Sequence, residues 1–452
     1  MSKKYFQQQS TGMAESYFRL KKVYYSIALL SFSSWVNAAS ISLQQAIEKT
    51  SVYQASQQIW ATQSNIDTAN LVQSTLWKNP ELSIEQTGFD ANQEQELSVG
   101  ISQELDIFGV KKANRQLAVL AQDQTTLQQQ IYQAQVQLAV KYLWSQLAIT
   151  ELERNIVQAQ LNVSEANVNA IQKRFQAGSV AEVDLKRAKL SHSENIRLFK
   201  QADLQVQLAQ QQLSHVWGES DKTLQVKLNP TQLWPSESHA NVQRYLAENY
   251  LEKSRQLQLK TSQAQAEYIK AESRPNPTLS FGVNRSKAPE NSSENQIMLG
   301  VSVPLNIFDR QQYSLDIQQQ KQAALTRQQS FYTQQNALRI GTLLTELQGL
   351  EVQFNDIEQT QLPLATEVQQ KMLLGFSAGK FALTDVQQAT LQLQDIRQRK
   401  VELLKRAWQN AITAESLALG LEPSVVMSND GLAQLNQSLW ENIQSLPTLG
   451  GN

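Results

Sequence analysis

The sequence predicts a mostly helical chain with a small β part, built from two copies of one structural unit. The segment 99–108 (VGISQELDIF) recurs as 299–308 (LGVSVPLNIF). Two long segments rich in Gln, Ala, Leu and Lys follow these copies, and such composition favours extended helices. Short stretches of alternating polarity precede each long segment and are typical of strands. A repeat that covers half of the chain indicates one unit used twice.

The repeat continues on both sides of these copies. The segment NPELS at 79–83 returns as NPTLS at 276–280, and the offset between matching positions drifts only from 197 to 201 residues. RFQAG at 174–178 returns as GFSAG at 375–379, each followed by an aspartate, Asp184 and Asp385. We therefore divide the chain into a first repeat at 40–228, a linker at 229–238, a second repeat at 239–422 and a C-terminal tail at 423–452.

Composition excludes several classes of function. The formal net charge of -1 provides no attraction to nucleic acid, and the absence of cysteine excludes disulfides and lipidation through an N-terminal cysteine. His192, His215 and His239 have no partner at metal-ligand spacing, so no metal site is predicted. The chain contains no nucleophile–base set and no phosphate-binding loop. We therefore expect no enzymatic activity and no cofactor.

The first 39 residues have the three parts of a secretory signal peptide. Arg19, Lys21 and Lys22 precede an apolar run at 23–35, which ends in Val-Asn-Ala-Ala at 36–39. The run is too short to span a bilayer as a stable helix, although a membrane anchor is the alternative. We predict a cleavable signal peptide at 1–39, with Met1 or Met13 as the start.

Two hairpins are expected, at about 80–105 and about 277–305. In the first, Leu82 and Ile84 alternate with Glu81 and Glu85, and the second segment repeats the alternation. No apolar run in the mature chain is long enough to span a membrane, so a chain that crosses one must do so as a closed barrel. The polar face, with Glu81, Glu85 and Glu96, would then line a water-filled lumen. A small soluble sandwich is the alternative.

Four strands cannot close a membrane barrel, which needs at least about eight. The barrel interpretation therefore requires an oligomer of two, three or four chains, and a symmetric ring is the expected arrangement.

Each hairpin is followed by a very long helix, a tight turn and a return helix. The first long helix is expected at about 109–176, with a turn at 177–181, and the second at about 309–376, with a turn at 377–383. We expect a kink at Pro363 and a capping box of Ser179 and Glu182 at the start of the first return helix. Apolar spacing of three and four residues suits the wall of a hollow tube and an antiparallel coiled-coil bundle equally well.

Together, the signal peptide, the duplicated helix–hairpin–helix unit, the Asn-Pro strand openings and the Phe-x-Ala-Gly-x5-Asp turns resemble the TolC-like outer-membrane efflux family. The segments 79–82 and 303–309 are most similar to the CzcC branch, which serves cation-efflux pumps. The resemblance implies a homotrimer in the outer membrane of a Gram-negative bacterium. Its twelve-stranded barrel, four strands from each chain, would be surrounded by outer-membrane lipid and be continuous with a periplasmic helical barrel.

The resemblance also implies the function and the partners. The chain would be the passive exit duct of a tripartite efflux system, working with a periplasmic adaptor and an inner-membrane RND pump, with heavy-metal cations as the expected substrates. Efflux of drugs or other organic compounds and type I secretion are alternatives within the same architecture. A secreted periplasmic coiled-coil scaffold is an alternative of another class.

Finally, the resemblance assigns roles to the two turns. The family's gate tyrosine, gate arginine and second ring aspartate fall at Phe376, Phe381 and Gln388, so aromatic packing is expected to replace a polar latch. Asp184 and Asp385 match acidic gate positions, but would equally stabilise the N-termini of the return helices. Adaptor contact is expected at seven turn residues: Ala177, Gly178, Ser179, Val180, Ala378, Gly379 and Lys380.

Overall fold

The structure is a computed structural model that describes residues 40–89, 93–226, 233–288, 293–428 and 433–437. The predicted signal peptide, residues 229–232 of the predicted linker and most of the C-terminal tail lie outside this part of the chain. Within the described residues, no helix combines the length and the apolar character needed to span a bilayer.

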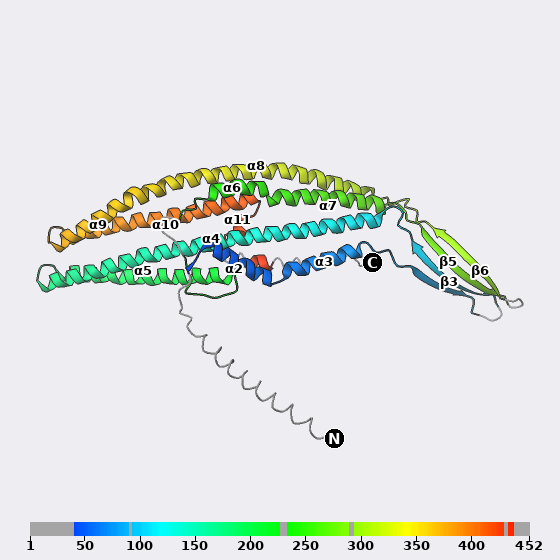
Figure 1. Ribbon diagram of the computed structural model, residues 1–452, viewed down its shortest axis with the longest axis horizontal. Coiled ribbons are helices and arrows are strands. Elements are labelled where there is room, and N and C mark those ends of the chain that lie inside the picture. Colours follow the sequence, from blue (N-terminus) through cyan, green and yellow to red (C-terminus); the bar gives the residue numbers. More distant parts are fainter. Residues whose placement is uncertain (1–39, 90–92, 227–232, 289–292, 429–432, 438–452) are drawn as a thin grey trace, which may run out of the picture.

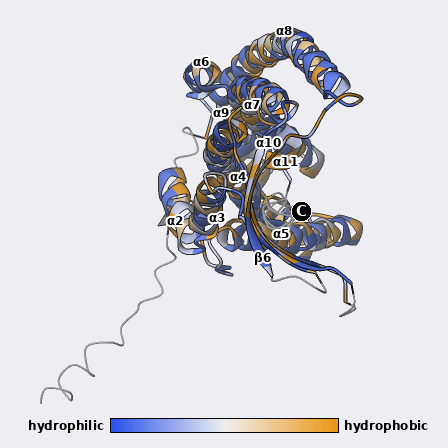
Figure 2. Ribbon diagram, turned by 90° about the vertical axis from the view of Figure 1, so that its right-hand side faces the viewer, coloured by the Kyte–Doolittle hydropathy of each residue, from blue (hydrophilic) through white to orange (hydrophobic). Residues whose placement is uncertain are grey.

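The chain forms an elongated body of long helices, with a sheet at one end and two helical turns at the other (Figure 1). The first repeat contributes helices α2 (Leu43–Ser56), α3 (Ile59–Gln73), α4 (Val110–Gln176) and α5 (Glu182–His215). The second contributes α6 (Ser238–Glu248), α7 (Tyr250–Glu272), α8 (Gln312–Asp356), α9 (Leu362–Ser377), α10 (Leu383–Leu419) and the short α11 (Pro423–Val426). Figure 2 shows hydrophilic and hydrophobic residues interspersed along α8, as expected for a narrow apolar stripe.

The sheet joins the two repeats. Its strands are β2 (Glu81–Thr87), β3 (Gln95–Glu104), β5 (Thr278–Lys287) and β6 (Glu294–Ser302), all antiparallel in the order β2-β3-β5-β6. They occupy the segments in which the two hairpins were expected. Among the described residues, no helix and no second sheet covers either face (Figure 1), so the sandwich alternative is wrong.

The long helices run almost as expected. α4 is one unbroken helix of 67 residues, which is ~100 Å at 1.5 Å per residue. In the second repeat, a π-helical turn, Ile357–Gln361, separates α8 from α9 and ends two residues before Pro363. Since proline lacks an N–H and crowds the preceding turn, a locally widened helix accommodates it. At the position where a kink was expected, the helix is therefore interrupted by a π-helical turn.

The capping box expected at the first turn is wrong. The N-cap of α5 is Ala181, which has no side-chain hydrogen bond to the helix, and the backbone N–H of Ser179 instead donates to the carbonyl of Arg174, 2.8 Å away. Ser179 therefore belongs to the end of α4 and not to the start of α5.

The hydrophobic core lies midway along the body, where α4 and α10 pack together. The rings of Trp144 and Trp408 meet edge to face, with centroids 6.3 Å apart. Nearby, Lys141 Nζ lies 2.7 Å from both carboxylate oxygens of Glu415, which is fully buried. Two short parallel strands, β1 (Ser40–Ile41) and β4 (Gln225–Val226), pack beside this region, and Trp144 Nε1 donates to the carbonyl of Ile41 at 3.3 Å. The contacts hold the two repeats together at mid-length.

Candidate functional site

The four-stranded sheet has one apolar face and one polar face. Directly opposite residues of antiparallel strands share a face, so the register sorts the side chains into rows. Two rows of the apolar face cross all four strands: Ile84, Val99, Val283 and Ile297, and Leu82, Ile101, Phe281 and Leu299. The polar face carries Glu81, Ser83, Glu85, Thr87, Glu96, Ser98, Ser102, Ser280, Asn284, Ser286, Glu294, Gln296 and Ser302, together with Gly100, Gly282, Gly300 and Met298. The three predicted lumen carboxylates, Glu81, Glu85 and Glu96, thus share one face.

Both faces of the sheet are open. On the apolar face, the Leu299 side chain is 75% exposed, and Ile297 and Val301 are similarly exposed. A contiguous apolar surface of this kind marks an interaction site in a folded protein. The outer strands β2 and β6 pair on one side only among the described strands, so each presents a row of unpaired backbone groups. Among the described residues, the sheet therefore has no packing partner on either face and no pairing partner at either edge.

At the other end of the body, the two helical turns pack on each other. A small apolar cluster formed by Ile171, Leu185, Ala188, Phe376 and Val386 joins them. Phe376 is only 3% exposed, so it does not project from the tip. The guanidinium of Arg174, on α4, lies over the Phe376 ring at 4.4 Å from its centre. This cation–π contact connects the first turn to the second.

In the second turn, the ring of Phe381 occupies the space that a side chain at position 375 would fill. Phe381 is 41% exposed and packs against Gly375, where an added Cβ would collide with the ring. In the first repeat, Arg174 stands at the position of Gly375 and Val180 at the position of Phe381. The larger side chain of the pair therefore comes before the turn in the first repeat and after it in the second. Gly178 and Gly379 have φ of +72° and +76°, and both complete the C-termini of their long helices as glycine readily does.

The two predicted gate aspartates have different environments. Asp385 Oδ2 accepts a hydrogen bond from the backbone N–H of Ala382 at 3.0 Å, so it caps the start of α10. Asp184 is half-buried in the first turn of α5, and its carboxylate has no hydrogen bond or ion pair with the described residues. Gln388 is exposed one turn further along α10. The seven predicted contact residues lie in the two turns, and all but the half-buried Val180 are exposed.

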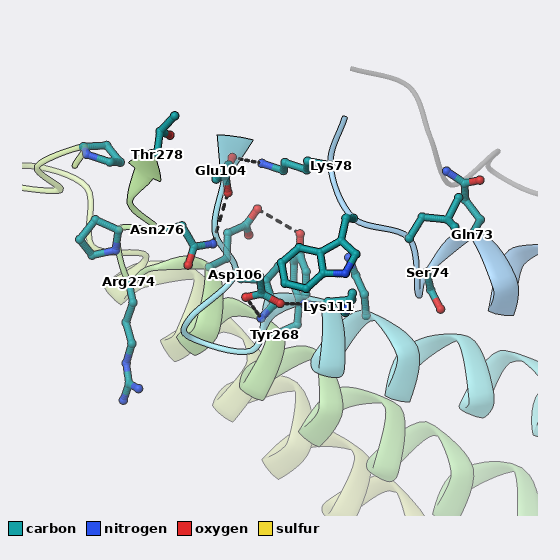
Figure 3. Close-up of a pocket in the computed structure, with 17 residues that line it drawn as sticks. Gln73, Ser74, Lys78, Glu104, Asp106, Lys111, Tyr268, Arg274, Asn276 and Thr278 are labelled. Carbon is teal, nitrogen blue, oxygen red and sulfur yellow. Dashed lines mark hydrogen bonds and ion pairs between the residues drawn. The ribbon is translucent and has the colours of Figure 1, made fainter. Parts of the chain in front are cut away.

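Sequence reasoning missed Arg174. It had been quoted only as part of the repeat, although its replacement by Gly375 in the second copy signalled a difference between the two turns. Sequence reasoning also missed a pocket of about 390 Å³ at the junction of the sheet and the helices (Figure 3).

In this pocket the carboxylates of Glu104 and Asp106 have ion-pair or hydrogen-bond partners close by. Glu104 Oε2 lies 2.7 Å from Lys78 Nζ, and Glu104 Oε1 accepts from Asn276 Nδ2 at 3.3 Å. Asp106 accepts the backbone N–H groups of Gly109, Val110 and Lys111 at 2.8–2.9 Å and so caps α4. Elsewhere, no group of three or more side chains among the described residues could hold a metal ion.

Comparison with known proteins gives one relative in sequence and several in structure. The chain is 25% identical over 261 residues to the cobalt-zinc-cadmium resistance protein CzcC of Cupriavidus metallidurans. The match spans 57% of this chain and 61% of CzcC, so it covers less than two thirds of that protein. No protein-family model matches the chain.

Solved structures of bacterial outer-membrane proteins share the fold. The outer-membrane protein VceC of Vibrio cholerae superposes with a TM-score of 0.64 at 16% identity, covering 84% of this chain and 96% of VceC. CusC gives 0.65 at 17% identity, with 87% and 96% covered, and the CmeC outer-membrane channel of Campylobacter jejuni gives 0.61 at 13%, with 91% and 94% covered. The mostly helical, TolC-like fold predicted from the sequence is confirmed.

Proposed function

We propose that this chain is the outer-membrane subunit of a tripartite efflux system of the RND type, a passive exit duct for heavy-metal cations. The observation that carries the proposal is the open four-stranded sheet, apolar on one face and polar on the other. An open apolar face requires an apolar environment, and the polar face requires water. Lipid outside and a water-filled lumen inside satisfy both.

The free edges of the sheet require more than one chain. If β6 of one copy pairs with β2 of the next, every backbone group of the sheet finds a partner. Three copies give twelve strands, above the minimum of about eight for a membrane barrel. The long helices of three copies would continue this barrel as a helical tube into the periplasm, which agrees with the ~100 Å length of α4.

The duct itself performs no chemical step. It offers a polar solute a water-filled path, so that a bare ion never enters hydrocarbon. The driving force must come from a partner, and we assign this role to an inner-membrane pump reached through a periplasmic adaptor. The adaptor would contact the exposed tips of the two turns, including Gly178, Ser179, Gly379 and Lys380. CzcC is named for resistance to cobalt, zinc and cadmium, which supports metal cations as the substrates.

We place the gate at the same turns. Arg174 on Phe376 would hold the two turns together, while Phe381 on Gly375 would pack the tip of the second turn; together they would keep the mouth closed, in place of a polar latch. Copies of Asp184 and Asp385 from three chains would surround the opening and favour cations, while Gln388 adds no charge.

The scaffold alternative fits the sheet poorly. A periplasmic scaffold would leave the apolar rows in contact with water, at a cost of about 25 cal/mol for each Å² of apolar surface. Drug efflux and type I secretion fit the same sheet and helices, so the substrate must be tested directly.

The decisive experiment compares a deletion strain with strains complemented by the parent chain or by a charge variant. Glu81→Gln, Glu85→Gln and Glu96→Gln remove three carboxylates of the polar face and leave Glu294, and Glu182→Gln at the exposed start of α5 is the control. We expect tolerance to zinc, cobalt or cadmium to fall in the deletion strain and to return with the parent. In planar bilayers, the triple variant should lose cation selectivity, read from the reversal potential. Recovery of the chain as a periplasmic monomer would refute the channel, and loss of tolerance only to organic compounds would refute the metal substrate.

A further inference from the structure

The pocket at the junction of sheet and helices lies at a defined level of the molecule. Its lining comes from the segment between α3 and β2, the first turns of α4, and the connection from α7 to β5. In Figure 3, Lys78, Glu104 and Asn276 converge beside the start of the strands, and Lys111 lies toward the start of α4. Its volume of about 390 Å³ lies at the small end of the range of ligand pockets.

Two cations that line the pocket, Lys111 and Arg274, have no anionic partner among the described residues. Arg274 is exposed, and its guanidinium lies over the Phe108 ring, 5.7 Å from its centre. Glu104 is paired with Lys78, Asp106 accepts three backbone N–H groups, and Glu272 accepts from the Tyr268 hydroxyl at 3.0 Å. Lys111 Nζ forms no ion pair or hydrogen bond with the described residues and lies over the ring of Trp77, 4.1 Å from its centre. An ammonium with spare donors at the mouth of a pocket is a ready partner for an anion.

One acceptor of the pocket is also unused. Asn276 donates through Nδ2 to Glu104, which fixes the orientation of the amide. Its Oδ1 is buried and has no hydrogen-bond partner among the described residues. A buried acceptor in this state is costly unless a donor occupies the space beside it. The pocket therefore presents cationic donors that could hold an anion and one buried acceptor that could take a hydrogen-bond donor.

The surroundings of the pocket are apolar and exposed. Large apolar residues on the neighbouring loops, Leu76, Trp77, Ile107, Leu305 and Phe308, each expose more than half of their surface. Leu76 and Trp77 line the pocket, and the other three follow the ends of strands β3 and β6. Tryptophan next to lysine at such a boundary is typical of the headgroup level of a membrane.

We infer that this pocket binds the headgroup of phosphatidylethanolamine, with the lipid phosphate on Lys111 and the ammonium near Asn276 Oδ1. The acyl chains would then lie against the exposed apolar loops and the apolar face of the sheet. This inference rests on the proposed function, because it needs the sheet to be embedded in a membrane. The site would anchor the barrel at a fixed depth where it meets the helices.

The test uses the purified full-length mature chain in nanodiscs of equal parts phosphatidylethanolamine and phosphatidylcholine, followed by release in detergent and native mass spectrometry. We expect the parent to retain phosphatidylethanolamine in excess, since the choline group has no N–H to donate. Lys111→Ala should lower the retained lipid about fivefold, the effect expected of one lysine at a lipid surface. Lys112→Ala is the control, because Lys112 is exposed and does not line the pocket.

Two further arms separate the possible outcomes. Inorganic phosphate at millimolar concentration should not displace the lipid, and displacement would show a phosphate site rather than a lipid site and overturn the inference. Channel conductance is recorded for the same preparations. A conducting chain that retains no lipid, or that retains equal amounts after Lys111→Ala, refutes the lipid site alone, whereas a chain that does not enter bilayers refutes the proposed function.

Discussion

The guanidinium of Arg174 lies 4.4 Å from the centre of the Phe376 ring and connects the two helical turns of one chain. The two residues belong to different repeats, on α4 and α9. Phe376 is buried and Arg174 is half-buried, and a cation–π contact of this kind contributes about 1–2 kcal/mol. The contact therefore joins the turn between α4 and α5 to the turn between α9 and α10.

This contact predicts how the closed state can be weakened. Arg174→Ala should raise the conductance in planar bilayers because it removes the contact between the two turns. Phe381→Ala should raise it because it removes the ring that packs the tip of the second turn. The control is Arg187→Ala, an exposed arginine of α5 outside the cluster. If Arg174→Ala, Phe376→Ala and Phe381→Ala all conduct like the parent, aromatic closure of the mouth is wrong.

The two faces of the sheet predict opposite responses to charge at neighbouring positions. Val283→Arg places a cation on the apolar face and should cost about 2–4 kcal/mol in the membrane, sharply reducing the amount assembled in the outer membrane. Asn284→Arg places the same side chain on the polar face and should leave assembly near the parental amount. Heat-resistant oligomer in outer-membrane fractions provides the measurement, and equal loss in both variants would contradict the assignment of the faces.

The cap that Asp106 forms at the start of α4 is expected to contribute to the free energy of unfolding. Asp106→Ala removes the carboxylate that accepts three N–H groups at the start of α4, and loss of such a cap costs about 1–2 kcal/mol. Asn306→Ala, at the matching position of the second repeat, is the control, because Asn306 only donates to the carbonyl of Ser273. Chemical denaturation followed by circular dichroism should show a larger fall for Asp106→Ala, and equal falls would argue against the capping role.

Glu151 predicts a dependence of stability on pH. Burial raises the pKa of Glu151 to about 7, against the opposing effects of the Val226 N–H and of Arg154. The folded state therefore binds this proton more tightly than the unfolded state does. The resulting stabilisation is complete below the unfolded pKa of about 4.5 and is lost as the pH rises through about 7.

The measurement is the melting temperature between pH 5 and pH 8. Glu151→Gln keeps an acceptor for the Val226 N–H, at present 3.1 Å from Oε1, but cannot ionise. The variant should show a flatter pH profile than the parent in this interval. Glu153→Gln, two residues away on the same helix, should keep the parental slope.

The architecture could be predicted because it follows from short-range patterns. Period-two alternation located the strands, and two segments with few helix breakers located the long helices, to within three residues at their starts. Ser179 was misassigned because a Ser-x-x-Glu pattern also fits the end of a helix, where the Ser179 N–H completes the C-terminus of α4. A local pattern does not tell which of two adjacent helices uses a residue.

Contacts between segments far apart in the chain could not be predicted. The stacking of Arg174 on Phe376 and the spare ammonium of Lys111 both depend on how segments far apart in the chain pack. Family resemblance pointed to Phe376 as a gate position, but its burial became visible only in the structure. Periodicity shows which face of an element is apolar and leaves open what covers that face.

The one-sided pairing of β2 and β6 has a genetic consequence. In hydrocarbon each unpaired backbone group costs several kcal/mol, so in the proposed barrel a lone chain would not complete insertion, and one defective copy would impair the whole ring. A variant that folds yet carries proline in the middle of β6 would still join healthy copies through β2 and spoil the whole ring. Such an allele should be dominant over the wild type, whereas a simple deletion should be recessive.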